Sequence, residues 1–433
     1  MIFASNTVGS AASHTVLLMV LLLSVTLLVA LISKRLRLPY TLILVVVGLL
    51  LGFLPILSEI TFNPDIVLFL FLPPLLFEGA WNVDITQIAA DWLPIVLLAG
   101  PGLLLAVAIL ATTLHLAIGL PWLLAILLGA IISPTDPVVV LSLLKQLGLP
   151  ERLCIVVEGE SLFNDGVGVA VFGIVLGLLL PSLGMAAVTG NFGHLSGLTI
   201  TLASLWLLLG GPLLGLVMGW IVARFLLLVD DHLIETTVTF SVAYGAYLLG
   251  DTLHTSGLLT VVGAGLVIGS YGRNRQMSQH AQETAQEVWE FIAYLANSLL
   301  FLLLGIQIGA SHFLDALPGI FWAVLGIIGG RFLMVYLLVP VQNVLARRIA
   351  RGRTLRFLPK PRPLPANWHP VFVLAGLHGA LSLALVLSLP VKFVQRKLLE
   401  DIVYGVVLVT LLGQGLALRF LLPYWPIVAE DVP

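Results

Sequence analysis

The residues of this chain that could do chemistry are acidic and hydroxyl side chains inside apolar stretches. Asp136 lies in the segment Ser133-Pro134-Thr135-Asp136-Pro137, and Asp165 closes a second segment, Glu158-Gly159-Glu160-Ser161-Leu162-Phe163-Asn164-Asp165. Charges are costly in apolar surroundings, and those that persist usually face a cavity or a partner. Because carboxylate and hydroxyl oxygens suit hard cations, the first segment predicts a cation site at Asp136.

The first segment also predicts a broken helix. Pro134 and Pro137 each remove a backbone donor and clash with the preceding turn, so a helix should unwind there. Unwound backbone at membrane depth is tolerated where it lines protein or water. Its carbonyls would then face a cation beside the hydroxyls of Ser133 and Thr135. The alternative is a kinked helix with a satisfied, buried Asp136, but a kink alone does not require the acid.

The second segment carries polar groups on neighbouring faces of one helix. Residues four apart share a face. This spacing places Glu160 over Asn164 and Ser161 over Asp165. The alternative is that Glu158 and Glu160 are solvated at the cytoplasmic mouth, and for Glu158 this alternative is favoured over a functional role. It does not explain Asp165, which lies well inside the apolar run.

Glu78 and Arg331 are two further charges associated with apolar runs. Glu78 ends a run near a predicted membrane boundary, where a functional and a solvated position fit equally. Arg331 lies deep in an apolar stretch, and a guanidinium there requires a carboxylate. We nominate Glu160 as its partner in a structural ion pair.

The elements that carry these residues are membrane spans. Of the 433 residues, 59% are apolar and 10% are charged, against about 25% charged in a soluble domain, so the chain needs lipid as its solvent. Windows of about 20 apolar residues predict about thirteen spans in one all-α transmembrane domain that covers the whole chain. They are expected at residues 13–33, 38–57, 65–81, 93–118, 121–145, 153–180, 198–227, 234–250, 255–271, 289–309, 317–345, 369–390 and 398–422. The short tail after the last span predicts no soluble regulatory domain.

A second broken helix is expected in the twelfth span, at Gly376-Leu377-His378-Gly379-Ala380-Leu381-Ser382. Transporters often place two broken helices in inverted repeats, where they cross near the substrate. If the first span is set apart, the remaining spans form two groups of six. The two breaks then differ by one position between the groups.

The distribution of Lys and Arg predicts the orientation, because cytoplasmic loops are enriched in both. With the N-terminus outside and the C-terminus in the cytoplasm, the outer loops hold only Lys392, Arg396 and Lys397. The inner loops hold most of the others, including the run at 347–362. A basic run of this kind faces anionic lipid and indicates no nucleic-acid partner. The expected location is an inner or plasma membrane.

Four motifs together resemble the sodium/proton antiporters of the NhaP type, within the monovalent cation:proton antiporter superfamily. The motifs are Phe71-Leu72-Pro73-Pro74-Leu75-Leu76-Phe77-Glu78, the segments at 133–137 and 158–165, and Gly376-Leu377-His378-Gly379-Ala380. The resemblance implies a homodimer, with core helices at about 92–180 and 289–390 and the other helices on the dimerisation side. It implies elevator-type alternating access and no cofactor, only transported Na⁺ (or Li⁺ or K⁺) and H⁺.

The resemblance also implies roles for individual residues. Asp165 is the residue loaded alternately by cation or proton. Asp136, Thr135 and Ser161 shape the site, while Glu160, Asn164 and Arg331 hold the core together. An Asn immediately before the key Asp goes with electroneutral exchange in this family.

One residue departs from the family pattern. His378 stands where the family usually has Arg, which replaces a permanent charge by a group that titrates near neutrality. The pH profile of the family therefore does not carry over. We treat His378, like Glu78, as an accessory candidate.

Exchange follows if one carboxyl group takes both ions in turn. Burial disfavours a charged carboxylate, so Asp165 can hold a proton or a cation but not both. Two alternatives use the same acids. One is a cation channel, for which no repeated filter sequence is evident. The other is an intramembrane aspartyl protease with Asp136 and Asp165 as a dyad, but the neighbouring Pro137 and Asn164 fit cation coordination better.

Overall fold

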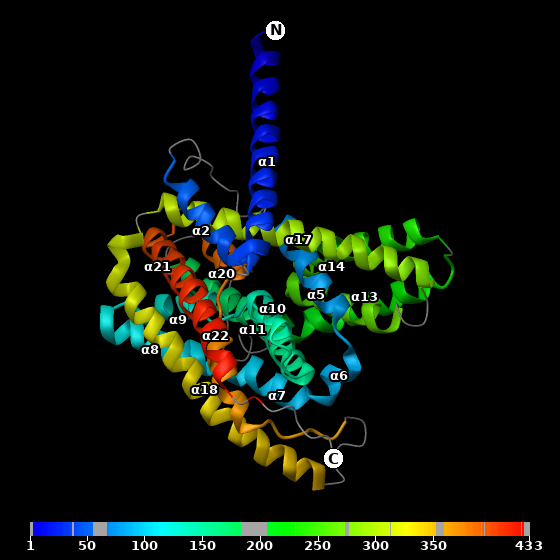
Figure 1. The fold of residues 1–433 in the computed structure, drawn as a ribbon, viewed down its shortest axis with the longest axis vertical. Helices are drawn as coiled ribbons and strands as arrows, with labels where there is room; N and C mark the ends of the chain where they lie inside the picture. The colour runs from blue at the N-terminus through cyan, green and yellow to red at the C-terminus, as the bar shows by residue number, and fades with distance from the viewer. Residues whose placement is uncertain are drawn as a thin grey trace.

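The computed structural model describes residues 3–36, 39–54, 67–182, 206–229, 231–272, 277–311, 313–351, 359–390, 392–393, 395–425 and 427, and its regular structure in these ranges is helical (Figure 1). Each predicted span coincides with a helix, a continuous run of helical turns or a pair of half-helices. The span ends predicted at residues 38, 55–57, 65–66 and 198–205 lie outside the described residues. The expectation of an all-α polytopic fold is confirmed.

The helices are described here in chain order. The first are α1 (Phe3–Leu36), α2 (Tyr40–Gly52), α5 (Leu72–Asn82), α6 (Ile85–Ala90), α7 (Trp92–Leu97) and α8 (Leu103–Ile118). The next are α9 (Trp122–Ile132), α10 (Val138–Gln146), α11 (Glu151–Ser182), α13 (Gly211–Leu226), α14 (His232–Thr252), α15 (Gly257–Val267) and α17 (Gln279–Ala310). The last are α18 (Leu317–Arg351), α19 (His369–Leu374), α20 (Ala380–Leu387), α21 (Arg396–Val409) and α22 (Gly415–Leu421). Single π-helical turns join α7 to α8 and α21 to α22, so each of these pairs is one span.

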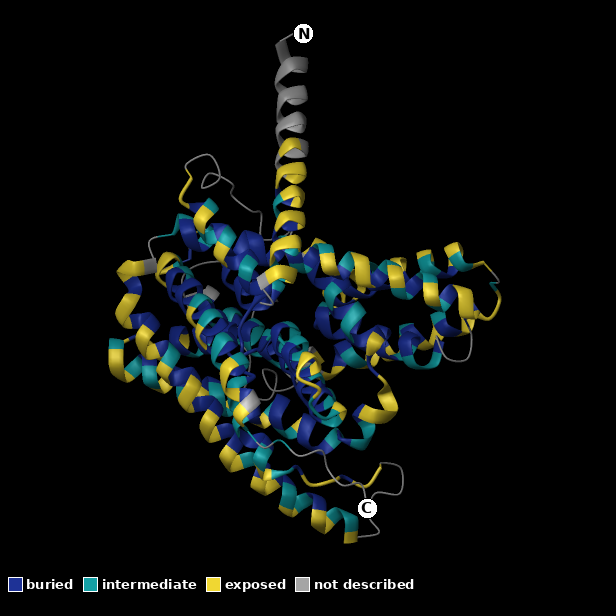
Figure 2. Ribbon diagram, in the orientation of Figure 1, coloured by how far each residue is buried: buried dark blue, intermediate teal, exposed yellow. Residues whose placement is uncertain are grey.

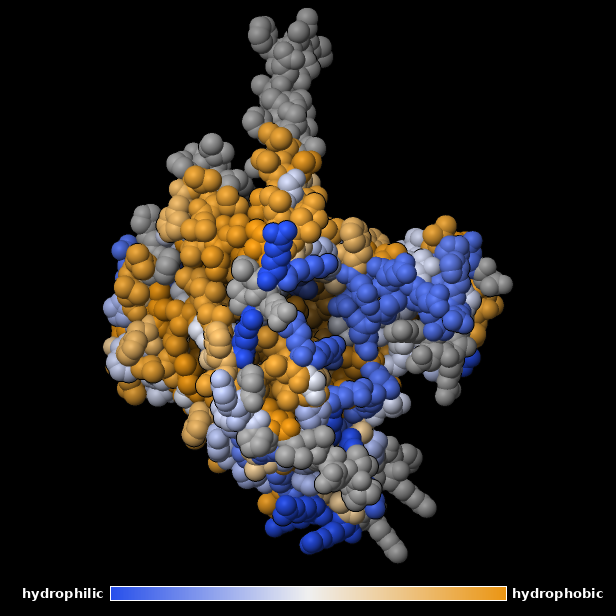
Figure 3. All heavy atoms as spheres, in the orientation of Figure 1, coloured by the Kyte–Doolittle hydropathy of each residue, from blue (hydrophilic) through white to orange (hydrophobic). Residues whose placement is uncertain are grey.

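The outer helices present apolar side chains, as lipid-facing helices do. Large apolar residues such as Phe321 and Phe332 on α18 and Trp220 on α13 are exposed (Figure 2). Five helical runs among the described residues are long and apolar enough to cross a membrane unbroken. Figure 3 shows apolar atoms covering the region around α2 and α21, and hydrophilic residues gathered across the right-hand side of the view and at the lower end, where α18 ends. The protein is a multi-pass membrane protein.

Two of the spans are broken in the middle. Helix α9 ends at Ile132 and α10 begins at Val138, and in the same way α19 ends at Leu374 and α20 begins at Ala380. Each break has an unbroken span before it and another after it: the α7–α8 run and α11 in the first case, α18 and the α21–α22 run in the second. The two broken units therefore occupy matching positions. The predicted offset of one position between the two breaks arises because the first span was set apart before the other spans were divided into two groups.

Glycine contacts fix α17 against α2. Gly48 and Gly305 face each other so closely that a Cβ on Gly48 would lie 2.9 Å from the Cα of Gly305. Close backbone approach through small residues is a common mode of helix packing in membranes. This contact sets the position of α17, which lines the cavity described below.

A connection after α18 is tied to the first half of the fold through Asp91, which is 1% exposed. Arg152, at the start of α11, donates to both carboxylate oxygens of Asp91 at 2.8–3.1 Å, and Arg362 donates to one of them at 3.2 Å. Arg152 also donates to the carbonyl of Pro363 at 3.2 Å. The starts of α7 and α11 and the segment around Arg362 therefore lie on one face of the molecule.

Candidate functional site

The two breaks meet each other at the centre of the fold. The backbone N–H of Asp136 donates to the carbonyl of Leu377 at 2.7 Å. In the opposite direction, Nδ1 of His378 lies 2.9 Å from the carbonyl oxygen of Pro134. A helix break leaves backbone N–H and C=O groups without their partners in the helix. Each unwound segment here supplies a hydrogen-bond partner for one such group of the other segment. The expected crossing of two broken helices is present.

A polar cluster supports the first break from behind. Asn164 of α11 donates from Nδ2 to the Thr135 hydroxyl at 2.9 Å and accepts from the Thr135 N–H at 3.3 Å. The hydroxyls of Thr135 and Ser161 lie 3.1 Å apart. Thr135, Ser161 and Asn164 are each 2% exposed or less. This network holds the unwound segment against α11.

Arg331 and Glu160 form a buried ion pair beside this cluster. Both guanidinium Nη atoms donate to the two carboxylate oxygens, with Nη2 at 3.0 Å from Oε2. Nε of Arg331 donates to the carbonyl of Phe372 at 3.0 Å. Glu160 is 1% exposed and Arg331 7%. The nominated contact is present, and it joins α11 to α18 and, through Phe372, to α19.

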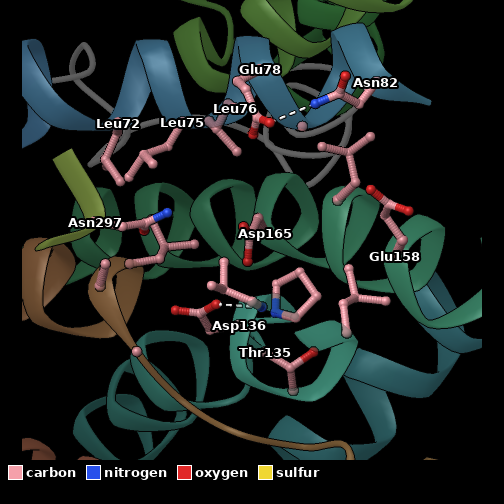
Figure 4. Close-up of a pocket in the computed structure, with 18 of the residues that line it drawn as sticks. Leu72, Leu75, Leu76, Glu78, Asn82, Thr135, Asp136, Glu158, Asp165 and Asn297 are labelled. Carbon is pink, nitrogen blue, oxygen red and sulfur yellow. Dashed lines mark hydrogen bonds between the residues drawn. The ribbon is translucent and has the colours of Figure 1, made fainter. Parts of the chain in front are cut away.

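A cavity of 580 Å³ reaches the crossing from one side of the molecule (Figure 4). Asp136, Thr135 and Asp165 line it, with Gly379 and Ser382 from the second broken span. Oδ1 of Asp136 accepts from the N–H of Val138 at 3.0 Å and so caps the start of α10. Asp165 reaches the same space from α11 (Figure 4). The two acids are therefore brought together at one cavity.

The outer part of the cavity carries further charges. Glu78 of α5 lines it and accepts from the side chain of Asn82, and Glu158 lines the opposite wall (Figure 4). Lys145 and Glu290 complete this polar mouth. Glu78 is therefore a residue of the access route, away from the crossing.

Sequence reasoning missed several cavity residues on α17. Asn297 and Glu290 both line the cavity, and Asn297 is drawn near Asp165 in Figure 4. A polar residue inside the apolar run 289–309 is the same signal that identified Asp136 and Asp165. Applying that signal to every span would have identified Asn297.

The residues that share a helix face within α11 are not each other's hydrogen-bond partners. Glu160 pairs with Arg331 instead of Asn164, and Ser161 bonds to Thr135 instead of Asp165. The reason is that partners from packed helices lie closer than the residue one turn along the same helix. Ser161 and Asn164 lie behind Thr135 and do not line the 580 Å³ cavity. The carbonyls of Pro134 and Leu377 are likewise engaged across the crossing, so fewer backbone oxygens face the cavity than expected.

Residues 20–423 match the family described as sodium/hydrogen exchanger, transmembrane. The chain is 36% identical over 416 residues to the low-affinity Na⁺/H⁺ antiporter NhaS1 of Synechocystis sp., an alignment that covers 95% of this chain and 75% of that protein. It is 33% identical over 417 residues to the Na⁺/H⁺ antiporter NhaH of Halobacillus dabanensis, which covers 94% of this chain and 97% of that protein.

A solved structure shows the same fold. The sodium proton antiporter MjNhaP1 from Methanocaldococcus jannaschii superposes with a TM-score of 0.67 at 21% identity, over 93% of this chain and 96% of that one. The likeness to this structure concerns the fold, and the sequence match over nearly the whole chain concerns the family. The chain belongs to the family of transmembrane sodium/hydrogen exchangers.

Proposed function

We propose that this protein is a secondary transporter that exchanges Na⁺ for H⁺ across a cell membrane, with Asp165 as the shared binding site. The observation that carries the proposal is the meeting of Asp136 and Asp165 at one cavity beside two crossed helix breaks. Hard cations bind oxygen ligands, and the carboxylates of Asp136 and Asp165 offer them there. Relatives that carry antiporter names cover nearly the whole chain.

Competition at Asp165 gives the coupling. Among the described residues, no hydrogen bond engages the Asp165 carboxylate, whereas Asp136 caps α10 and Glu160 is held by Arg331. Asp165 can therefore take a proton or a cation from the cavity without breaking a structural contact. The Asp165 carboxylate cannot hold a cation and a proton at the same time. If the protein changes its conformation only when Asp165 holds one of them, the fluxes of the two ions are coupled.

The neighbour of Asp165 supports electroneutral exchange. Asn164 supplies no charge, and its amide is already bonded to Thr135. One titrating carboxyl group then carries either one proton or one monovalent cation. We propose Na⁺ as the principal cation, with Li⁺ and K⁺ as competitors to be tested.

The motion that exposes Asp165 to each side is proposed to be an elevator movement. The core expected from the sequence consists of the helices at about 92–180 and 289–390. We propose to shift its second part to residues 317–422, because Gly305 packs α17 closely against the α2 backbone. This core would move against α2, α5, α13, α14, α15 and α17, which would form the dimerisation side of a homodimer. The 580 Å³ cavity supports this division, because α5 and α17 line it on one side and α10, α11 and α20 on the other. An interface that opens to water is where such sliding would occur.

The cavity is proposed to open to the cytoplasm. Lys145 lies at its mouth, and cytoplasmic loops are enriched in basic residues. This direction agrees with the orientation expected from the Lys and Arg distribution, with the N-terminus outside and the C-terminus in the cytoplasm, which we propose for this protein. The state described here would then be the inward-open one.

Transport by purified protein in sealed proteoliposomes tests the proposal. Wild-type protein should move H⁺ in response to a Na⁺ gradient. Asp165→Asn should not, because an amide does not exchange a bound proton for a bound cation. Glu283→Gln, at an exposed position on α17, is the matched control and should transport normally. Cation-driven proton movement in Asp165→Asn would overturn the assignment. Net current without a proton gradient would indicate a channel instead.

A further inference from the structure

One ring nitrogen of His378 has no hydrogen-bond partner among the described residues. The side chain is 2% exposed, and its Nδ1 lies 2.9 Å from the Pro134 carbonyl. A carbonyl oxygen can only accept, so Nδ1 carries the hydrogen and Nε2 of the neutral ring is an acceptor. Nε2 is buried, and no described residue lies in hydrogen-bond geometry with it, although the carbonyl of Ile132 is a second backbone acceptor near the ring. Buried polar atoms in folded proteins nearly always have a partner, from protein or from ordered water.

A second, smaller cavity adjoins this ring. Its volume is 20 Å³. Polar residues form one part of its wall and apolar residues the other: Ser133, Thr135, Glu160, Asn164, Arg331 and His378, with Leu98, Leu103, Ala106, Ile327 and Met334. A polar cavity of roughly 15 Å³ or more accommodates one water molecule. Asp136 and Asp165 line the large cavity and not this one, whereas Thr135 lies between the two. The small cavity is thus behind the cation site.

We propose that the small cavity binds one water molecule that donates to Nε2 of His378, and that this water makes His378 a positioning residue for the first helix break. The water would accept from the fifth N–H donor of Arg331. Three of the five donors go to Glu160 and Phe372, and one contacts the Met334 sulfur at 3.9 Å. The water would donate its second hydrogen to a cluster oxygen such as that of Thr135.

The chemistry of the wall favours water over an ion. A cation there would lie beside the guanidinium of Arg331, which already neutralises Glu160. An anion would face the lone pair of Nε2. Water alone donates to Nε2 and accepts from Arg331 at the same time.

The consequence concerns the geometry of Thr135 and Asp136. His378 reaches the backbone just before them, at the Pro134 carbonyl. A water that fixes the ring therefore fixes that carbonyl, and with it the unwound segment that lines the cation cavity. This functional part rests on the proposed exchange activity, but the water site itself does not.

Radiolytic footprinting tests the water site without any transport measurement. X-rays convert bound water to hydroxyl radicals, which oxidise the nearest thioether. Met334 lines the small cavity and is 1% exposed, whereas Met277 is 6% exposed and lines neither cavity. Met334 should be oxidised several-fold faster than Met277 in the wild-type protein, although it is the more buried of the two. Equal oxidation rates, or a slower rate at Met334, would show that the small cavity holds no water.

The tautomer gives a second measurement on the unmodified protein. ¹⁵N spectra of histidine-labelled protein at neutral pH should show a ring with hydrogen on Nδ1 only whose resonance disappears in His378→Asn. His115, whose Nδ1 lies 2.8 Å from the Leu120 carbonyl, should give a second such ring that remains in the variant. A doubly protonated ring, or one with its hydrogen on Nε2, would contradict the proposal.

A pair of variants separates the two nitrogens in transport. The amide nitrogen of His378→Asn can replace Nδ1 and keep the bond to Pro134, whereas that of His378→Gln replaces Nε2 and loses it. We expect His378→Gln to raise the KM for Na⁺ several-fold more than His378→Asn. Equal KM values for the two variants would show that His378 does not act through Pro134.

Discussion

Gly379 of the second broken span lies so close to Asp136 of the first that a Cβ at position 379 would overlap the Asp136 carboxylate, with the Asp136 Cγ only 3.0 Å away. The same carboxylate lines the large cavity and caps α10. The position of a proposed cation ligand on one broken helix is therefore limited by the absence of a side chain on the other.

The first prediction is that Gly379→Ala impairs cation binding. The added methyl must displace the Asp136 carboxylate, because its other close contacts are Cβ and Cγ of the same residue. A displacement that costs about 1.4 kcal/mol of binding raises the KM for Na⁺ about tenfold. Initial rates in proteoliposomes over a range of Na⁺ concentrations measure this. The control is Gly413→Ala, where a Cβ meets nothing within 4 Å, and its KM should be unchanged. If the KM of Gly379→Ala is also unchanged, Asp136 takes no part in cation binding.

The second prediction concerns the buried ion pair. Glu160→Gln leaves the Arg331 guanidinium buried with no opposite charge, and breaking such a pair costs about 3–5 kcal/mol. Thermal unfolding in detergent should show a much lower midpoint for this variant. Removing both charges in Glu160→Gln with Arg331→Gln should recover part of the loss.

The control for the ion pair is Arg396 with Glu400, which is 18% and 20% exposed. This pair is partly buried but still reached by solvent, and solvent-accessible pairs contribute about 0–1 kcal/mol, so Glu400→Gln should shift the midpoint much less than Glu160→Gln. If Glu160→Gln and Glu400→Gln shift it equally, burial of the first pair has no energetic consequence.

The sequence predicted the parts of the site that depend on local chemistry. Pro134 and Pro137 located the first break, and the buried charge of Arg331 required an acid that the structure supplies as Glu160. Helix spacing does not predict hydrogen-bond partners that come from other helices. It put Ser161 on the same face as Asp165, but the hydrogen-bond partner of Ser161 is Thr135 from the neighbouring span. The bond from His378 to Pro134 joins residues far apart in sequence, so no periodicity within one helix could indicate it.

The third prediction is that Gly305→Ala destabilises the protein. In an exposed helix interior, Gly→Ala stabilises by about 1 kcal/mol. At position 305 the methyl would lie 2.8 Å from the Cα of Gly48 and the N of Leu49, which are backbone atoms that cannot rotate away. Overpacking of this kind costs about 1–3 kcal/mol, so the sign should reverse. Thermal unfolding measures the stability of Gly305→Ala and of its control Gly329→Ala, where the added Cβ meets nothing within 4 Å. If Gly305→Ala is stabilised, α2 and α17 separate freely.

The fourth prediction concerns the start of α14, outside the membrane. The Asp231 carboxylate accepts from the N–H of Ile234 at 3.0 Å and of Leu233 at 2.9 Å. These backbone hydrogen bonds, with that of Ile234 foremost, lower the pKa of Asp231 below the ordinary value of about 3.9. Because the pKa of the folded state is the lower one, the cap is fully present above pH of about 4 and is lost as the pH falls through the folded value.

Hydrogen exchange at the amides of Leu233 and Ile234 measures this loss. After correction for the intrinsic pH dependence of exchange, their protection should be constant from neutral pH down to about pH 5 and should fall below about pH 4. Asp231→Asn keeps an acceptor oxygen that does not titrate in this range, so its protection should not change with pH. A wild-type profile as flat as that of Asp231→Asn would mean that solvent, and not the carboxylate, satisfies the first turn of α14.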